Sequence, residues 1–563
     1  MPDSRPSVLL RHVEFFAYLL AIWSFLVLFL EPIVGFYVKY HSVELFTALA
    51  NILLLSLTIV NRAFSGDAKQ KRNMILFDVI MLLLGAMLLA YQAKFVIFFL
   101  LIRQTYYILQ YFIFKAFEGR LHKLLTDNPP VSLMLSFAGV ITVGTIMLML
   151  PAASVKGQVT HFLDALFTAT SATCVTGLVV FETGTYFTLF GQIVILVLIQ
   201  IGGLGIMTIS TAFALMLGQR LTLKLENVMQ SVVGDTHVVN LFKLLRSIVL
   251  VTVLIEFIGA IFLFFSFSKV LPTSQALYNA IFHSVSAFCN AGFALWSDNM
   301  MSFVDSPVVT FTISFLIILG GLGFTVIIDL YRKLFSNDKI KKLTLHSKIV
   351  LATTGALILI GFVTLFVAEY HGSMQGFSVS RRLLSSWFQS VTMRTAGFNT
   401  IDISRLSSAS VLVALILMFI GASPGSTGGG VKTTTITVLM LSVTSMLRGR
   451  RDLSIFNRKI AVSNAREATT LLTISASVIF VIVFLLMLVE PFSFEKIIFE
   501  AISAFGTVGL SMGITSDLSY TGKALITLLM YIGRIGPLTM IYALSMRKRQ
   551  PNISFAEENI AIG

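Results

Sequence analysis

The chain has 563 residues, of which 56% are hydrophobic and only 12% are charged, and its mean hydropathy is +0.89. Soluble domains use charged residues at about one position in four, so this composition excludes a soluble globular protein. The net charge of +14 would suit a nucleic-acid binder, but the distribution of the basic residues argues for membrane topology instead, and no nucleic-acid partner is expected.

The first part of the chain contains four apolar runs long enough to cross a bilayer, which takes about 20 residues. They lie near residues 12–30, 43–61, 74–92 and 95–114. The first run shows no small-residue cleavage pattern before Glu31 and Pro32, so we interpret it as a retained helix and not as a signal peptide. For Asp78 and Arg103, a structural ion pair is favoured over a voltage sensor, which needs arginines in series.

About eight further apolar spans follow from residue 131, which makes about twelve in all. Basic side chains gather in alternate connecting segments, at residues 219–246, 332–348, 448–466 and 547–549. The positive-inside rule assigns these segments to the cytoplasm. We therefore predict a multi-pass protein of the cell inner (plasma) membrane, surrounded by membrane lipid, with both termini in the cytoplasm.

Four stretches in the second part of the chain repeat one another. They read FTATSATCVTGL at 167–178, IFHSVSAFCNAGF at 281–293, WFQSVTMRTAGF at 387–398 and FEAISAFGTVGL at 499–510. Each stretch has an aromatic residue ten positions before a glycine, and these glycines are Gly177, Gly292, Gly397 and Gly509. Successive glycines lie 105 to 115 residues apart, which leaves room for one span out of each loop and one span into the next. Such a period indicates a repeat architecture.

Each repeat is predicted to be a span, a pore loop and a second span. Non-helical backbone at membrane depth is tolerated only where it lines a cavity or is buried in protein. The segment before each glycine, about ten residues with small side chains such as Ser171, Ser286 and Ser503, suits a half-membrane helix. Glycine adopts positive φ without strain, so each loop can turn carbonyl oxygens toward a common axis, where they replace the water of a potassium ion.

A second glycine element recurs 24 to 28 residues after each loop glycine. Its members are Gly202–Gly203, Gly320–Gly321, Gly421 and Gly533. Any one of these pairs is more simply a packing surface between membrane helices. The common offset in all four repeats nevertheless predicts that the downstream spans are repeated as well.

The loops, above all CVTGL, CNAGF, RTAGFNT and GTVGL, resemble those of the Trk/Ktr/HKT superfamily of potassium transporters, most closely the Ktr-type membrane subunit, over residues 131 to the end. The resemblance implies an all-α polytopic membrane protein with four helix–pore-loop–helix units around one pore, preceded by about four extra transmembrane helices. The implied division is 1–125 for the extra region, then 126–240, 241–345, 346–460 and 461–563 for the four repeats.

The resemblance also implies a selectivity filter made of the three residues that end at each loop glycine. These residues are Val175, Thr176, Gly177, Asn290, Ala291, Gly292, Thr395, Ala396, Gly397, Thr507, Val508 and Gly509. Their backbone carbonyls would bind the transported potassium ion, and no other metal and no cofactor is expected in this chain. Relatives that favour sodium carry serine at the first of these glycines, so Gly177 favours potassium. Arg394 is interpreted as a structural residue that holds pore-helix carbonyls.

The stretch GASPGSTGGGVKTTT at 421–435 interrupts the third downstream span. Gly425 and Gly430 have the glycine spacing of a nucleotide-binding P-loop, but Val431 separates the last glycine from Lys432 and both flanks are apolar, which argues against one. Because proline and glycines cannot continue a helix, we predict a break in this inner helix only. The resemblance implies that the break is an intramembrane gate, with gate residues Gly425, Gly428, Gly429, Gly430, Lys432 and Arg534.

Arg534 lies within the last apolar span and should face the protein interior or a cavity, because a charge is costly in lipid. The alternative is a structural arginine bonded to carbonyls before Pro537.

Partners and the type of transport follow from the resemblance and from missing motifs. No HExxH or similar catalytic motif occurs, so the chain is not expected to be an enzyme. The cytoplasmic loops also lack GxGxxG, and the resemblance therefore implies a homodimer with a cytosolic ring of Rossmann-type nucleotide-binding subunits. Channel-like flux and a sodium- or proton-coupled symporter of the same fold stay open as alternatives.

Overall fold

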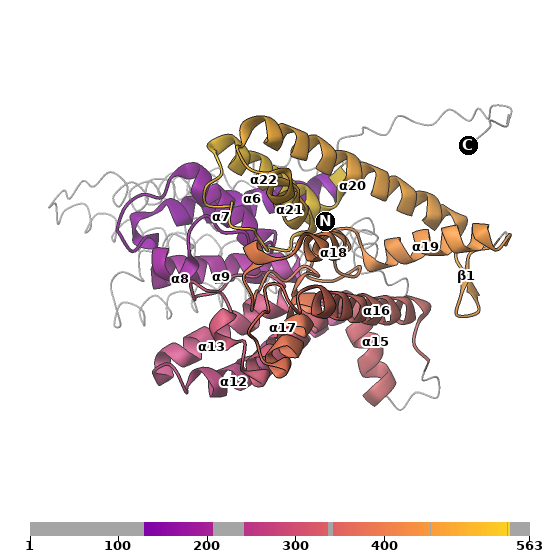
Figure 1. Ribbon diagram of the computed structural model, residues 1–563, viewed down its shortest axis with the longest axis horizontal. Helices are drawn as coiled ribbons and strands as arrows, with labels where there is room; N and C mark the ends of the chain where they lie inside the picture. Colours follow the sequence, from indigo (N-terminus) through magenta and orange to yellow (C-terminus); the bar gives the residue numbers. More distant parts are fainter. Residues whose placement is uncertain (1–128, 206–240, 336–341, 451, 538, 541–563) are drawn as a thin grey trace, which may run out of the picture.

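Figure 1 shows the computed structural model of the protein, which describes residues 129–205, 241–335, 342–450, 452–537 and 539–540. Regular structure in these ranges is helical, apart from one hairpin that pairs β1 (Ser454–Ile455) with β2 (Arg458–Lys459) in antiparallel register. The four apolar runs predicted before residue 115, with Asp78 and Arg103, lie outside the described residues. So do 219–240 and 547–549 of the segments predicted to be cytoplasmic.

A long outer helix begins each of the four repeats. These helices are α6 (Pro129–Met149), α12 (Leu241–Phe267), α16 (Leu345–Ala368) and α20 (Val462–Val489). The last three have both the length and the apolar composition of a membrane span. On α12 the side chains of Leu254, Phe257 and Phe265 are more than half exposed, as expected for a helix that faces lipid. The protein is therefore an all-α, multi-pass membrane protein.

A shorter pore helix follows each outer helix. The pore helices are α7 (Phe162–Thr173), α13 (Thr273–Phe288), α17 (Val379–Thr392) and α21 (Phe494–Gly506). They contain 12 to 16 residues, somewhat more than the ten predicted. Three of the four aromatic residues at the repeated position, Phe167, Phe282 and Phe499, are fully buried, and Trp387 is partly buried. The recurring aromatic therefore packs against the protein interior.

An inner helix completes each repeat. The inner helices are α9 (Leu189–Leu204), α14 (Pro307–Leu322) with α15 (Phe324–Phe335), α18 (Ser408–Phe419) with α19 (Thr433–Leu447), and α22 (Tyr520–Ile535). Each begins after a serine or threonine whose hydroxyl accepts a hydrogen bond from a backbone N–H three residues later, the preferred helix cap. The remaining short helices are η2 (Pro151–Ala153), α8 (Thr183–Tyr186), η3 (Met301–Phe303) and η4 (Ile403–Arg405).

The expectation that only the third inner helix is interrupted is wrong. The helices α9, α14 and α22 each end at a glycine with positive φ, namely 78° at Gly205, 91° at Gly323 and 91° at Gly536. At Gly323 the chain bends by 103° between α14 and α15. A glycine in a left-handed conformation is a common way to end a helix. Within the described residues, the third repeat differs from the second by the long non-helical insertion between α18 and α19.

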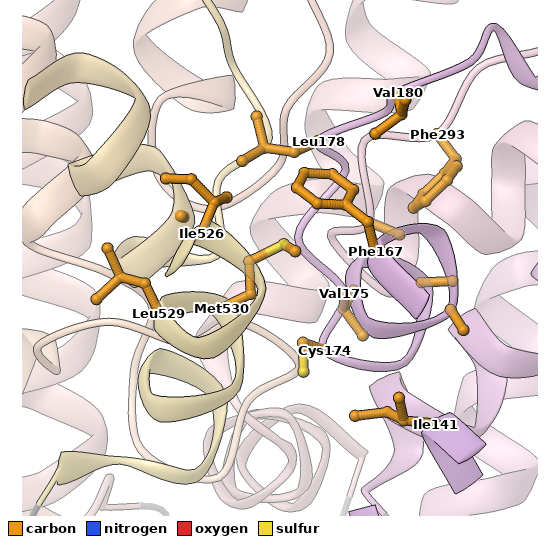
Figure 2. Close-up of a cluster of buried hydrophobic side chains, with 14 of the residues drawn as sticks. Ile141, Phe167, Cys174, Val175, Leu178, Val180, Phe293, Ile526, Leu529 and Met530 are labelled. Carbon is orange, nitrogen blue, oxygen red and sulfur yellow. The ribbon is translucent and has the colours of Figure 1, made fainter. Parts of the chain in front are cut away.

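The four repeats follow one another around a common centre (Figure 1). The inner helix of each repeat packs against the pore helix of the next, in the pairs α9–α13, α14–α17, α18–α21 and α22–α7. The last pair closes the ring, and there Lys523 Nζ donates to Asp164 Oδ1 over 2.8 Å. Figure 2 shows apolar side chains of α22, such as Ile526 and Met530, beside Phe167 of the first pore helix.

The repeated inner-helix glycines let these helices approach the pore helices closely. A Cβ atom at Gly202, Gly320 or Gly533 would collide with the carbonyl oxygen at the end of a pore helix, of Thr173, Phe288 and Phe505 respectively. The packing role considered for these glycines therefore holds, and it accounts for their common offset.

Candidate functional site

The four loops share an unusual backbone conformation. The loop glycines have φ of 93°, 69°, 81° and 91° at Gly177, Gly292, Gly397 and Gly509. Two residues earlier, a residue that is not glycine is also left-handed, namely Val175, Asn290, Thr395 and Thr507, with φ of 57°, 60°, 71° and 51°. Alternation of left-handed and ordinary residues turns successive carbonyl groups to the same side of the strand. The geometry is suited to a row of carbonyl dipoles facing a pore.

The left-handed residues two positions before each glycine were not expected from the sequence. Val175, Thr395 and Thr507 are β-branched, and such residues rarely adopt positive φ. A conformation of this kind persists only where the surrounding structure holds it, and it occurs often at functional sites. The local sequence preference of these residues therefore disfavours the left-handed conformation, which the surrounding fold imposes.

The four loops close a ring. A Cβ atom on Gly177 would meet the carbonyl oxygen of Ala291 in the second repeat. In the same way Gly292 faces the carbonyl of Ala396, Gly397 that of Val508, and Gly509 that of Thr176. Each loop thus approaches the next, and the fourth approaches the first. From each of the four segments predicted for the filter, the structure brings the glycine and the residue before it into one ring.

A cavity of about 330 Å³ lies on one side of this ring. All four loop glycines line it, together with the acidic residues Glu182 and Asp402. Negative side chains at the mouth of a cavity raise the local concentration of cations. This vestibule offers a cation a route to the carbonyl groups of the loops.

The predicted gate residues lie against the other end of the filter. Residues 420–432 form no helix between α18 and α19. The N–H of Gly429 donates to Thr507 Oγ1 over 2.9 Å, and a Cβ atom at Gly428 would meet Thr395 Oγ1. Lys432 Nζ donates to the carbonyl of Gly428 over 2.7 Å. This intramembrane loop therefore touches the first residue of two filter segments.

The loop is also hydrogen-bonded to the inner helix of the second repeat. The N–H of Ser423 donates to Gly321 O over 3.0 Å, and Gly425 O accepts a hydrogen bond from the N–H of Phe324 over 3.1 Å. Gly425 and Gly430 both have φ of 70°, a conformation that favours glycine. These contacts connect the loop to the bend between α14 and α15.

Arg534 joins the intramembrane loop to the first repeat. Its guanidinium donates to the carbonyls of Thr427, in the loop, and Gly202, in α9. The carbonyls just before Pro537, considered as alternative partners, are not those that accept its hydrogen bonds. Arg534 is thus a partly buried cation that joins the first and fourth repeats to the loop.

Arg394 does not hold pore-helix carbonyls in the way we predicted. The residue is 7% exposed, and its Nε atom has no hydrogen-bond partner. Within the described ranges, the structure gives its side chain no hydrogen bond to a carbonyl. The interpretation of Arg394 as a carbonyl clamp is therefore wrong for this part of the chain.

Two buried polar residues behind the filter were missed by the sequence analysis. Glu500 lies nine positions before Gly509, where its carboxylate accepts hydrogen bonds from the hydroxyls of Ser511 and Thr515. His283 has the same position in the second repeat, and its Nε2 atom accepts from Leu295 N over 3.2 Å. A titratable residue within an otherwise apolar pore helix was the available signal. Both residues hold the chain that leaves the filter.

Two glutamates at the ends of outer helices hold the starts of inner helices. Glu369, after α16, accepts hydrogen bonds from the N–H and the hydroxyl of Ser407, and Glu490, after α20, does the same for Ser519. Burial raises the pKa of Glu369, but hydrogen bonds from serines outweigh it and lower this pKa to about 2. Glu369 is therefore ionised at neutral pH.

Residues 103–555 match the family model of TrkH, described as a cation transport protein. The match covers most of the chain. The chain belongs to the TrkH family of cation transport proteins. The match begins 28 residues before the resemblance seen in the loops, so the last predicted extra span, at 95–114, overlaps the family region.

Curated members of this family resemble the chain over nearly their full lengths. The "Ktr system potassium uptake protein B" of Vibrio alginolyticus is 40% identical over 80% of this chain and 98% of its own length. The protein of the same name from Bacillus subtilis is 40% identical over 79% and 99%. The crystal structure of the potassium transporter TrkH from Vibrio parahaemolyticus aligns with a TM-score of 0.64 at 18% identity, covering 84% of this chain and 96% of that one. This last similarity supports the fold alone.

Proposed function

We propose that this TrkH-family chain takes up potassium ions across the membrane through a filter formed by its four loops. The observation that carries the proposal is the closed ring, in which each loop glycine faces the carbonyl that precedes the next one. Carbonyl dipoles around one axis replace the water shell of a potassium ion. The names of relatives at 40% identity, potassium uptake proteins of two bacteria, support the same substrate.

Growth of a bacterium that lacks its own potassium uptake tests this proposal. Expression of the chain should restore growth at limiting potassium, and Gly397→Asp, which puts a side chain against the carbonyl of Val508, should abolish the rescue. No rescue by a chain shown to reach the membrane would contradict potassium uptake.

A sodium- or proton-coupled symporter of the same fold is the second candidate. A relative from Enterococcus hirae, 38% identical, is called "Potassium/sodium uptake protein NtpJ". Flux into vesicles with one ion gradient imposed at a time separates the two. Potassium that moves down its own gradient alone argues for a channel-like pathway, whereas movement against that gradient, driven by sodium or protons, argues for coupling.

We further propose that the intramembrane loop is the gate and that Arg534 helps to hold it closed. Support comes from the position of the loop against Thr395 and Thr507 at the end of the filter, and from the hydrogen bond between Arg534 and Thr427. A cation beside the ion path repels a passing potassium ion. Opening would then require the loop or the charge to move.

Assembly and orientation complete the proposal. We propose that the chain forms a homodimer in the inner membrane and that both of its termini lie in the cytoplasm. Its four repeats would have the boundaries given in the sequence analysis. The dimer would bind a soluble ring of nucleotide-binding subunits. The relatives named as protein B of a Ktr system support a second component. To test the assembly, the protein is purified from its native membrane and the mass of the recovered complex is measured. Recovery of a single subunit that is still fully regulated would contradict the proposed assembly.

A further inference from the structure

The ring of filter carbonyls is supported from behind by side chains in some repeats and not in others. In the first repeat the N–H of Gly177 donates to Ser171 Oγ over 3.1 Å. In the fourth repeat the N–H of Gly509 donates to Ser503 Oγ, also over 3.1 Å. Both serines lie on the pore helix six residues before the glycine, and both are fully buried. These two hydrogen bonds are equivalent under the repeat.

In the part of the chain that the structure describes, the second and third repeats lack this hydrogen bond. Ser286 occupies the same position, but its hydroxyl donates to the carbonyl of Phe293 over 2.8 Å. In the third repeat the position is Val391, which has no hydroxyl and is 1% exposed. The backbone differs there as well, because Ala396 N bonds to Thr392 O. In the other repeats the corresponding N–H bonds to the carbonyl of the serine itself.

The peptide plane relates these serines to the pore. In a planar trans peptide, the C=O and the N–H point in opposite directions. The peptide between Thr176 and Gly177 directs its carbonyl oxygen toward the ring, where it faces Gly509, and its N–H backward to Ser171. A hydrogen bond on that N–H therefore fixes the direction of the Thr176 carbonyl. Ser503 does the same for Val508, whose carbonyl faces Gly397.

We infer that Ser171 and Ser503 are positioning residues for ion selectivity. They hold two adjacent carbonyls, those of Thr176 and Val508, in fixed directions. Among the described residues, no side chain accepts a hydrogen bond from the N–H of Gly292 or Gly397, so the carbonyls of Ala291 and Ala396 lack this restraint. The filter thus has one restrained half and one adaptable half. Discrimination between potassium and sodium depends on the restrained half. Sodium is the smaller ion, and carbonyls that are held in fixed directions cannot close around it to replace its water. This inference rests on the proposed potassium uptake.

The test compares serine variants in the full-length chain. Ser171→Ala and Ser503→Ala remove the acceptor, and Ser171→Cys keeps nearly the same volume with a much weaker acceptor. Inhibition of potassium uptake by sodium is measured for each variant, together with the amount of folded protein in the membrane. The matched control is Ser286→Ala, which removes a hydroxyl at the same repeat position that does not contact the N–H of Gly292.

Each of the three variants should lower the preference for potassium over sodium by about three- to tenfold, as expected for one lost hydrogen bond, with the maximal uptake rate nearly retained. The control should change that preference by less than about twofold. An unchanged preference in folded Ser171 and Ser503 variants, or an equal loss in Ser286→Ala, would overturn the inference. A wild-type chain that shows no preference for potassium would overturn the proposed function as well.

Discussion

The third and fourth repeats contain the same parts and use them differently. Both place a glycine in the ring, with φ of 81° and 91°. In the fourth repeat α22 continues without interruption to Ile535, and Ser503 supports the filter. In the third, Val391 replaces the serine and residues 420–432 separate α18 from α19. The comparison teaches that the backbone conformation at the ring glycine is the same in both repeats. The surrounding structure is free to specialise.

The two repeats also differ in how they are joined to their neighbours. The fourth repeat closes the ring on the first through Lys523 and Asp164, whose side chains are only 10% and 11% exposed. Within the described residues, the third repeat has an ion pair between Lys459 and Asp452 whose side chains are 63% and 60% exposed. The first kind of pair is expected to matter for stability and the second is not.

Breaking the closing ion pair should have the largest effect. Lys523→Ala leaves the carboxylate of Asp164 buried without its partner, which costs about 3–5 kcal/mol of stability. Thermal unfolding of the purified protein in detergent measures this loss. Lys459→Ala is the control, with an expected cost of about 0–1 kcal/mol for an exposed pair. Equal losses in the two variants would show that the ring does not depend on this contact.

Removing the insertion should make the third repeat resemble the fourth. A potential of 100 mV supplies an ion with about 2.3 kcal/mol, and we take the barrier of the closed loop to be of the same size. Deletion of residues 423–430 is therefore expected to raise potassium flux by about fiftyfold. Selectivity should persist because the four filter glycines are untouched. Arg534→Ala should give a smaller increase, and Arg448→Ala, an exposed basic residue, none. Unchanged flux in a folded deletion variant would assign the gate elsewhere.

The glutamate that holds Ser407 at the start of α18 should make the stability of the third repeat respond to acid. Glu369→Gln should cost about 1.5–3 kcal/mol at neutral pH, because hydrogen bonds to a charged acceptor are lost. The folded pKa of Glu369, about 2, lies below its ordinary value of 4.5. Its contribution is therefore complete above about pH 4.5 and is lost as the pH falls toward 2.

Melting temperatures of the wild type and the Glu369→Gln variant, compared between pH 8 and pH 3, check this dependence. Their difference should be constant down to about pH 5 and then narrow. A difference that widens on acidification would contradict the role given to the carboxylate.

Substitution of a ring glycine should have the smallest effect on stability, and its main effect should be on ion selectivity. Gly177→Ser places a side chain at φ 93°, which costs about 1–2 kcal/mol, and directs it at the carbonyl of Ala291. The preference for potassium over sodium should fall about tenfold. Gly157→Ser is the control, since Gly157 has φ of 64° with open space around it. Competition between the two ions gives the measurement, and an unchanged ratio would remove Gly177 from the filter.

Much of the architecture could be predicted because its signals are local. The recurring glycines mark positions where positive φ is needed, and GASPGSTGGG cannot be helical, so its sequence alone predicts an interrupted span. The bend at Gly323 was missed because a single glycine in an apolar run is also compatible with a continuous helix.

The sequence by itself determined the fourfold repeat and the apolar spans of a membrane protein, since both depend on the spacing of residues along the chain. It also determined the four loop glycines, since glycine alone adopts positive φ without strain. Only the tertiary structure decided which carbonyl each glycine faces, that Val175 and Thr507 are left-handed, and that Arg534 joins Thr427 to Gly202. Those features depend on contacts between residues far apart in the chain, such as Arg534 and Gly202, which are separated by 332 positions. Packing of the four repeats creates these contacts and overrides local preference.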